Sequence, residues 1–144
     1  PNILKLKKLI IELKLQNQVF LKGKFLNIFS YLKSADAFIF SSFSEGFPNV
    51  ILEAISCKIP VISTNCKSGP DEILFNKIMN LNENKEADLG ILCPHNNLEK
   101  FVEAIEDYCM NKLYWKNKIS KKYRSRIKDF DLKLITDQYL NFLK

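Results

Sequence analysis

Short apolar runs that do not alternate with polar residues constrain the fold of this chain most. Such runs occupy residues 37–40, 60–63 and 90–92. A strand with apolar side chains on both faces must be covered on both faces, as in parallel sheets flanked by helices. Stretches with apolar residues at helical spacing separate the runs. The sequence therefore predicts an α/β fold, a Rossmann-like parallel sheet with helices on both faces.

The remaining elements follow from periodicity and capping signals. We expect helices over residues 3–15, 27–34, 48–57 and 96–111, and one or two more over 112–143, broken near residues 129–131, as a helical C-terminal tail. Pro48 suits the first position of its helix because its missing N–H would be unpaired there anyway, and Asn96 and Asn97 are caps for the helix that follows them. Residues 19–21 read as one more short strand, and the polar, Asn-rich residues 75–89 as a loop.

Composition and charge exclude several classes of protein. The 144 residues fit one domain, and 47% hydrophobic with 26% charged residues excludes a disordered tail. No apolar run reaches the ~18–20 residues of a membrane span. Residues 112–144 contain ten basic residues and only three acidic ones. We expect solvated helix faces there and no nucleic-acid interface, while the aromatic-basic stretch 114–128 leaves a contact with an anionic membrane surface open.

Cysteine and histidine residues give no metal pattern. Cys57, Cys66, Cys93 and Cys109 form no C-x-x-C pair, so we expect free, buried thiols in a reducing cytosol. His95 is the only histidine and follows a predicted strand. We expect it to be exposed and without a functional role.

Glycine placement points to one edge of the predicted sheet. Gly23, Gly46 and Gly69 each fall in a loop just after a predicted strand. Glycine is favoured where the backbone must adopt positive φ or approach another group closely. Ligands of such sheets bind outside the carboxyl ends of the strands. The glycines indicate either this binding edge or ordinary turns.

The segment around the helix of residues 48–57 carries the chemistry. Glu53 is the only charge in that otherwise apolar helix, and burying an unpaired carboxylate costs several kcal/mol. Glu45 lies in the loop before the helix, whose free N–H groups and partial positive charge suit a phosphate. Two carboxylates around an anion-binding helix start suit a sugar nucleotide. The alternative is a capping acid and a partly exposed glutamate.

The same segment resembles a known family of enzymes. Glu45-Gly46-Phe47-Pro48-Asn49, with Glu53 eight positions after Glu45, is similar to the E-x7-E motif of retaining GT-B glycosyltransferases, glycosyltransferase group 1. The flanking residues 31–38, 54–63, 68–73 and 90–94 resemble the donor-binding half of that family. Ser56 and Lys58 stand where the family usually has Ala and Gly. The resemblance implies the C-terminal half of a GT-B fold over about residues 3–140.

The resemblance also implies roles for matched residues. Glu45 would contact the hydroxyls of the donor sugar and stabilise charge as the glycosidic bond breaks. Glu53 would bind the ribose hydroxyls, and main chain at Leu21 and Lys22 would face the nucleobase. The backbone around Gly46, Phe47, Pro48, Asn49 and Val50 would hold the sugar and the diphosphate of a UDP- or GDP-sugar. The family uses this donor as a substrate and needs no metal ion or other cofactor.

Parts of such an enzyme are absent from this sequence. Its first residue is Pro1, and the acceptor half of the fold and the first β-α unit of the donor half have no counterpart. We therefore expect residues 1–144 to be part of one donor-binding domain, cut from a longer protein and inactive alone. The implied enzyme is a hexosyl- or N-acetylhexosaminyl-transferase in cell-surface glycan, polysaccharide or glycolipid synthesis.

The resemblance implies partners and a location as well. A glycan or lipid-linked acceptor would bind the absent N-terminal domain, and the protein would be cytoplasmic or peripheral on the inner face of the membrane. Two alternatives remain open: a non-catalytic sugar-nucleotide-binding subunit that needs a separate acceptor-domain partner, and a sugar-nucleotide epimerase.

Overall fold

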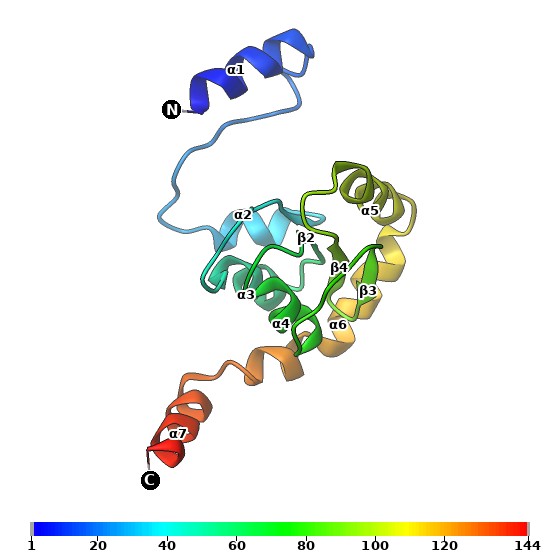
Figure 1. Ribbon diagram of the computed structural model, residues 1–144. Coiled ribbons are helices and arrows are strands. Elements are labelled where there is room, and N and C mark those ends of the chain that lie inside the picture. Colours follow the sequence, from blue (N-terminus) through cyan, green and yellow to red (C-terminus); the bar gives the residue numbers. More distant parts are fainter. Residues whose placement is uncertain (1, 144) are drawn as a thin grey trace.

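The computed structural model describes residues 2–143, which form a four-stranded sheet and seven helices (Figure 1). In chain order the elements are α1 (Ile3–Glu12), α2 (Phe29–Ser34), β1 (Phe38–Phe40), α3 (Asn49–Ser56), β2 (Val61–Thr64), α4 (Pro70–Phe75), β3 (Lys85–Ala87), β4 (Gly90–Cys93), α5 (Leu98–Met110), α6 (Lys112–Lys128) and α7 (Leu132–Phe142). The α/β class predicted from the apolar runs is confirmed. The three runs at 37–40, 60–63 and 90–92 became β1, β2 and β4.

The strands lie in the order β1-β2-β4-β3. β1 pairs with β2 and β2 pairs with β4, both in parallel, with Val61 opposite Phe38 on one side and Gly90 on the other. The carboxyl ends of these three strands therefore meet at one edge of the sheet, as the sequence predicted.

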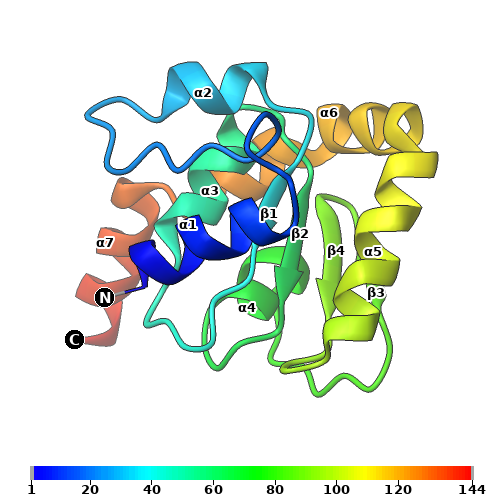
Figure 2. The same cartoon turned by 90° about the horizontal axis from the view of Figure 1, so that it is seen from above.

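Helices cover the sheet on both faces, because successive residues of a buried strand point to opposite sides. Val61 and Leu92 join the core formed with α3 and α4, whereas Ile62 and Ile91 join the core formed with α5. Figure 2 shows α5 running alongside β4. β1 lies at one edge of the sheet, and Ile39 in it is 49% exposed.

Two expectations about strands were wrong. Residues 19–21 form no strand and have no ladder partner, and they lie in the segment between α1 and α2. An apolar run becomes a strand only where a neighbour accepts and donates its backbone hydrogen bonds. The sheet is also not wholly parallel, since β3 pairs antiparallel with β4. β3 lies inside the stretch expected to be a loop.

Helix expectations held with small shifts. The break near residues 129–131 is confirmed by the end of α6 and the start of α7. Asn97 caps α5 by accepting a hydrogen bond from the N–H of Lys100 at 3.0 Å. Helix α3 begins at Asn49, so that Pro48 is its cap rather than its first residue. The short helix α4 was not expected.

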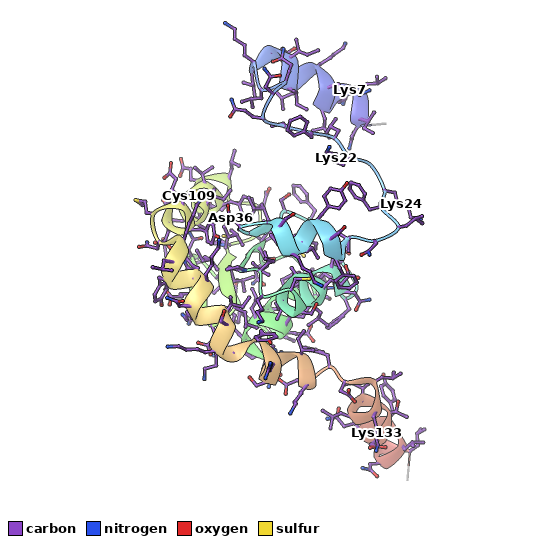
Figure 3. All side chains as sticks on the ribbon, turned by 180° about the vertical axis from the view of Figure 1, so that it is seen from behind. Lys7, Lys22, Lys24, Asp36, Cys109 and Lys133 are labelled. Carbon is purple, nitrogen blue, oxygen red and sulfur yellow. The ribbon has the colours of Figure 1, made fainter. Side chains whose placement is uncertain are left out.

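Helices α1 and α7 lie apart from the layered centre of the molecule (Figure 1), and neither has a buried residue. Lys133 marks α7 in Figure 3, at the opposite end of the molecule from the helix that carries Lys7. Across residues 2–143, no helix is both long enough and apolar enough to cross a membrane.

Candidate functional site

Glu45 lies in the loop that joins β1 to α3, at the carboxyl edge of the sheet. The loop starts at Ser41, directly after the last residue of β1, and Glu45 is half-buried in it. The hydroxyl of Ser42 donates a hydrogen bond to Oε1 of Glu45 at 2.6 Å. The carboxylate is therefore oriented by a neighbour in its own loop.

The start of α3 presents free backbone donors beside Glu45. The N–H of Asn49 is used locally, bonding to the carbonyl of Phe47 at 3.0 Å. No acceptor within the described chain pairs with the N–H groups of Gly46, Phe47 or Val50. Unpaired N–H groups at a helix start attract an anion, and the helix dipole adds to that attraction. The start of α3 therefore has free donors of the kind that the predicted anion site requires, and anion binding itself stays a prediction.

Gly69 fixes this helix start from the next loop along the sheet. Its φ is +101°, and a Cβ there would lie 2.3 Å from Cδ of Pro48. Only glycine allows both the positive φ and this close approach. A parallel backbone bridge between Ser44 and Lys67 ties the same two loops together. Of the three glycines expected at a binding edge, Gly69 makes such an approach.

Gly46 and Gly23 differ from Gly69. Gly46 lies in the site loop, but a Cβ there would meet nothing within 4 Å. Gly23 has φ of +72° and lies in the segment between α1 and α2, away from the edge. The prediction that three glycines gather at the binding edge is wrong for Gly23.

Glu53 lies one helical turn into α3 and is half-buried. The other side of this helix is fully buried through Ile51, Ala54 and Ile55. Among the residues that the structure describes, no hydrogen bond or ion pair satisfies the Glu53 carboxylate. The polar partner that the sequence led us to expect is therefore not supplied by residues 2–143, and a ligand role for Glu53 stays a prediction.

Leu21 and Lys22 are not brought to Glu45. They lie in the extended segment between α1 and α2, where Lys22 is seen beside α1 in Figure 3. The ammonium of Lys22 lies over the ring of Phe20, 5.3 Å from its centroid. Their contact with a nucleobase stays a prediction.

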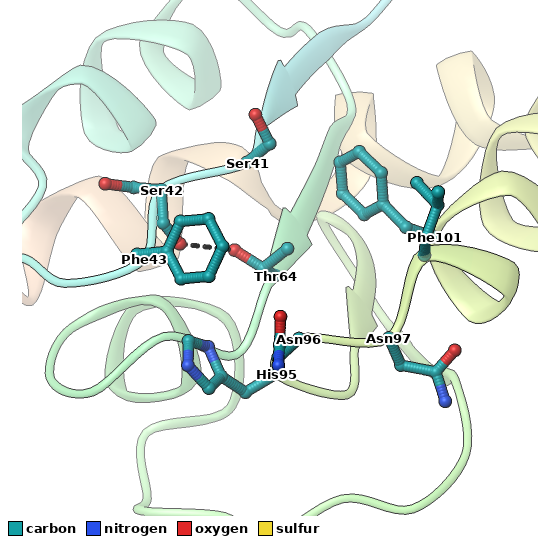
Figure 4. Close-up of a pocket in the computed structure, with 9 residues that line it drawn as sticks. Ser41, Ser42, Phe43, Thr64, His95, Asn96, Asn97 and Phe101 are labelled. Carbon is teal, nitrogen blue, oxygen red and sulfur yellow. Dashed lines mark hydrogen bonds between the residues drawn. The ribbon is translucent and has the colours of Figure 1, made fainter.

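A cavity of about 170 Å³ opens at the same edge, between the loops after β1 and β4 (Figure 4). The rings of Phe43 and His95 meet edge to face there, 5.8 Å apart. Thr64 at the end of β2 lies behind them and bonds to the loop of Ser42. His95 is exposed, as expected, and its contact is with an aromatic ring.

Two of the four thiols are buried and protonated. Burial raises the pKa of the Cys93 thiol to about 12. Burial, and secondly the negative charge of Glu45, raises the pKa of Cys66. Cys109 is exposed and Cys57 is half-buried, so the expectation of buried thiols is wrong for these two residues. No group of three or more His, Cys, Asp or Glu side chains within residues 2–143 is arranged to hold a metal ion.

These thiols give a simple test of the packing. A thiolate, not a thiol, attacks alkylating reagents, and with a pKa of about 12 only roughly one in 10,000 Cys93 side chains is ionised at pH 8. We expect iodoacetamide at pH 8 to modify Cys109 within minutes and Cys93 only after unfolding in urea, as read by peptide mapping. Fast labelling of Cys93 in the folded protein would contradict the buried position of β4.

The fold defines the class of protein. Over 98% of the chain it matches HepE of Anabaena, solved in complex with UDP, with a TM-score of 0.79 at 22% identity. TarM of S. aureus, solved with Fondaparinux, alpha-GlcNAc-glycerol and UDP, matches with the same TM-score at 23% identity. The structure has the fold of the matching part of these GT-B glycosyltransferases. The chain belongs to the family described as Glycosyl transferases group 1, whose pattern it matches over residues 2–129.

Relatives agree with this family but are much longer. An N-acetylgalactosamine-N,N'-diacetylbacillosaminyl-diphospho-undecaprenol 4-alpha-N-acetylgalactosaminyltransferase of Campylobacter jejuni is 31% identical over 94% of this chain. An uncharacterized glycosyltransferase of Methanocaldococcus jannaschii is 54% identical over 49% of it. The chain spans 34% of the first relative and 17% of the second. The family expected from the E-x7-E segment is confirmed.

The sequence interpretation overlooked Ser42 and Thr64. Ser42 precedes Glu45 by three residues, a spacing at which a hydroxyl can reach a side chain within one turn, so its role had a local signal. Thr64 lies 22 residues further on and bonds to the carbonyl of Ser42 at 2.8 Å. Only the parallel pairing of β1 with β2 brings Thr64 to that loop.

Proposed function

We propose that this chain is the donor-binding part of a retaining glycosyltransferase. The intact enzyme transfers a hexosyl or N-acetylhexosaminyl group from a UDP- or GDP-sugar to an acceptor in cell-surface glycan, polysaccharide or glycolipid synthesis. One observation carries the proposal. The oriented carboxylate of Glu45 lies next to unpaired N–H groups at the start of α3, in a chain of the group 1 family.

Each part of the donor has a group that suits it chemically. The N–H groups of Gly46, Phe47 and Val50 would take the diphosphate, with Pro48 and Asn49 shaping the turn. Glu45 would accept hydrogen bonds from sugar hydroxyls. The carboxylate of Glu53, which is unpaired within the described residues, would accept those of the ribose. Leu21 and Lys22 would reach the nucleobase only if their segment occupies another position in the intact protein.

Positioning and electrostatics would lower the barrier. As the glycosidic bond breaks, negative charge grows on the departing diphosphate and positive charge on the sugar. Fixed N–H donors at the helix start stabilise the first, and the carboxylate of Glu45 stabilises the second. The acceptor would attack from the face that the diphosphate leaves, which retains the anomeric configuration. This scheme requires no metal ion.

The rest of the proposal concerns what lies outside this chain. A glycan or lipid-linked acceptor would bind a second domain, so residues 1–144 would not transfer sugar alone. The enzyme would be cytoplasmic. Lys121, Lys122, Arg124 and Lys128 of α6 form no ion pair within residues 2–143. These cations would support a peripheral contact with the anionic inner face of the membrane.

Donor binding is the first test. We expect one of a panel of UDP-, GDP- and ADP-sugars to raise the Tm of the intact protein by several degrees, because a ligand at 100 times its Kd adds about 2.7 kcal/mol to the free energy of unfolding. The free sugar and the nucleoside serve as controls, since neither carries the diphosphate. Absence of a shift with every nucleotide-sugar would contradict the proposal. The anomeric configuration of the product, read by proton NMR, tests retention.

A further inference from the structure

The hydroxyl of Ser42 controls one of the two oxygens of the Glu45 carboxylate. Its hydrogen bond to Oε1 is 2.6 Å long, within the range of strong O–H···O⁻ bonds. Both residues are half-buried, so solvent competes only in part. Within residues 2–143 nothing else hydrogen-bonds to this carboxylate. Oε2 is thus left for a ligand, while Oε1 is held.

Ser42 is itself held by the sheet. The hydroxyl of Thr64 donates to the carbonyl oxygen of Ser42 at 2.8 Å, as the dashed line in Figure 4 shows. Thr64 is the last residue of β2 and pairs with Cys93 of β4. Two residues after Ser42, the backbone of Ser44 bridges to Lys67. The loop before Glu45 is therefore attached at two points, to the end of β2 through Thr64 and to the loop after β2 through Lys67.

We infer that Ser42 and Thr64 are positioning residues, which hold the Glu45 carboxylate in one orientation toward the transferred sugar. A glutamate in a loop has three rotatable side-chain bonds and samples several rotamers unless it is restrained. A restraint built on a strand end keeps a reacting group close to its productive geometry. The inference rests on the proposed function, because it assigns the free oxygen to a sugar hydroxyl.

The first variant removes only the hydroxyl of Ser42. In the intact enzyme we expect Ser42→Ala to lower kcat about tenfold, the lower end of what loss of a hydrogen bond to a charged group costs. The Kd for the nucleotide without its sugar should stay within about twofold, since in the proposed arrangement the nucleotide makes no contact with Glu45. Ser42→Thr keeps the hydroxyl and should recover most of kcat.

A matched control lies next to it. Ser41 belongs to the same loop, and its hydroxyl makes no hydrogen bond within the described chain. Ser41→Ala should leave kcat and KM unchanged.

The second variant removes the hydrogen bond from Thr64 to the carbonyl of Ser42. Thr64→Val keeps the shape of the side chain but loses the donor, and we expect a fall in kcat of about threefold or more. Thr64→Ser keeps the donor and should act like the native enzyme.

A double-mutant cycle separates positioning from general damage. If Ser42 acts through Glu45, then Ser42→Ala should lower kcat little further in a Glu45→Gln background. The inference would be overturned if the two substitutions lowered kcat by fully additive amounts, or if Ser42→Ala had native kcat. In either case a low kcat in Glu45→Gln would still support the proposed function. A Glu45→Gln enzyme with native kcat would instead overturn the proposed function. Equal losses in Ser42→Ala and Ser42→Thr, with a lower Tm in both, would show a structural role and also overturn the inference.

Discussion

Glu45→Gln in the intact enzyme is expected to lower kcat by roughly 10- to 150-fold and to leave nucleotide affinity within a few-fold. The lost charge-assisted interaction is worth about 1.5–3 kcal/mol, and it acts where charge develops in the transition state. The substituted amide can still accept the hydrogen bond of Ser42 through its oxygen. Shape and anchoring therefore persist, and a large loss reports the charge.

Glu53→Gln is the contrasting variant. The ribose contacts proposed for Glu53 would be made equally in the ground state and the transition state, so this change should weaken donor binding with a smaller effect on kcat. Steady-state kinetics with varied donor and calorimetric nucleotide binding separate the two outcomes. A native kcat in Glu45→Gln, or two variants that only lower Tm, would mean that the pair is structural.

Gly90→Ala is expected to disrupt the centre of the sheet. A Cβ at Gly90 would lie 1.8 Å from the carbonyl oxygen of Val61 and 2.7 Å from its carbonyl carbon. Both are backbone atoms of the paired strand β2, so neither can move without breaking the β2–β4 ladder. We expect a loss of about 4 kcal/mol or more, seen as a fall in Tm of at least about 10 °C or as loss of soluble protein.

Gly46→Ala is the control for this stability measurement. Its φ is not in the positive range, and its Cβ would meet no atom within 4 Å. The expected change in unfolding free energy is below about 1 kcal/mol. Circular dichroism during heating compares the two variants. Similar melting curves for both would show that β2 and β4 do not approach each other as described.

The central strands were predictable because each carries its own burial signal. β2 and β4 are apolar on both faces, which fits only a covered position. β3 has no such signal, since Lys85 and Glu86 are polar and exposed. It is held by pairing with β4 and by contacts of Glu86 with Lys118 and Tyr114, which also lower the pKa of that carboxyl. The two side-chain partners of Glu86, Tyr114 and Lys118, lie 28 and 32 residues away.

The candidate site also has a part that the local sequence predicts and a part that depends on distant contacts. Glu45, Pro48 and Glu53 lie within nine residues, so their spacing alone placed them around one helix start. The tether through Thr64 and the approach of Gly69 depend on two loops meeting at the sheet edge. The apolar run at residues 19–21 forms no strand although its local pattern predicts one, because a local pattern does not show whether a neighbouring strand is available to pair with it.

The contact between Gly69 and Pro48 limits which substitutions the two loops of this site can accept. Because a methyl group at Gly69 would overlap the proline ring, the loop after β2 and the start of α3 can change only together. A chimera that imports only one of these segments, from a relative with a larger residue in place of Gly69, would bring a steric conflict into the turn before α3. Recombination experiments and variant libraries should therefore exchange residues 45–50 and 65–70 together.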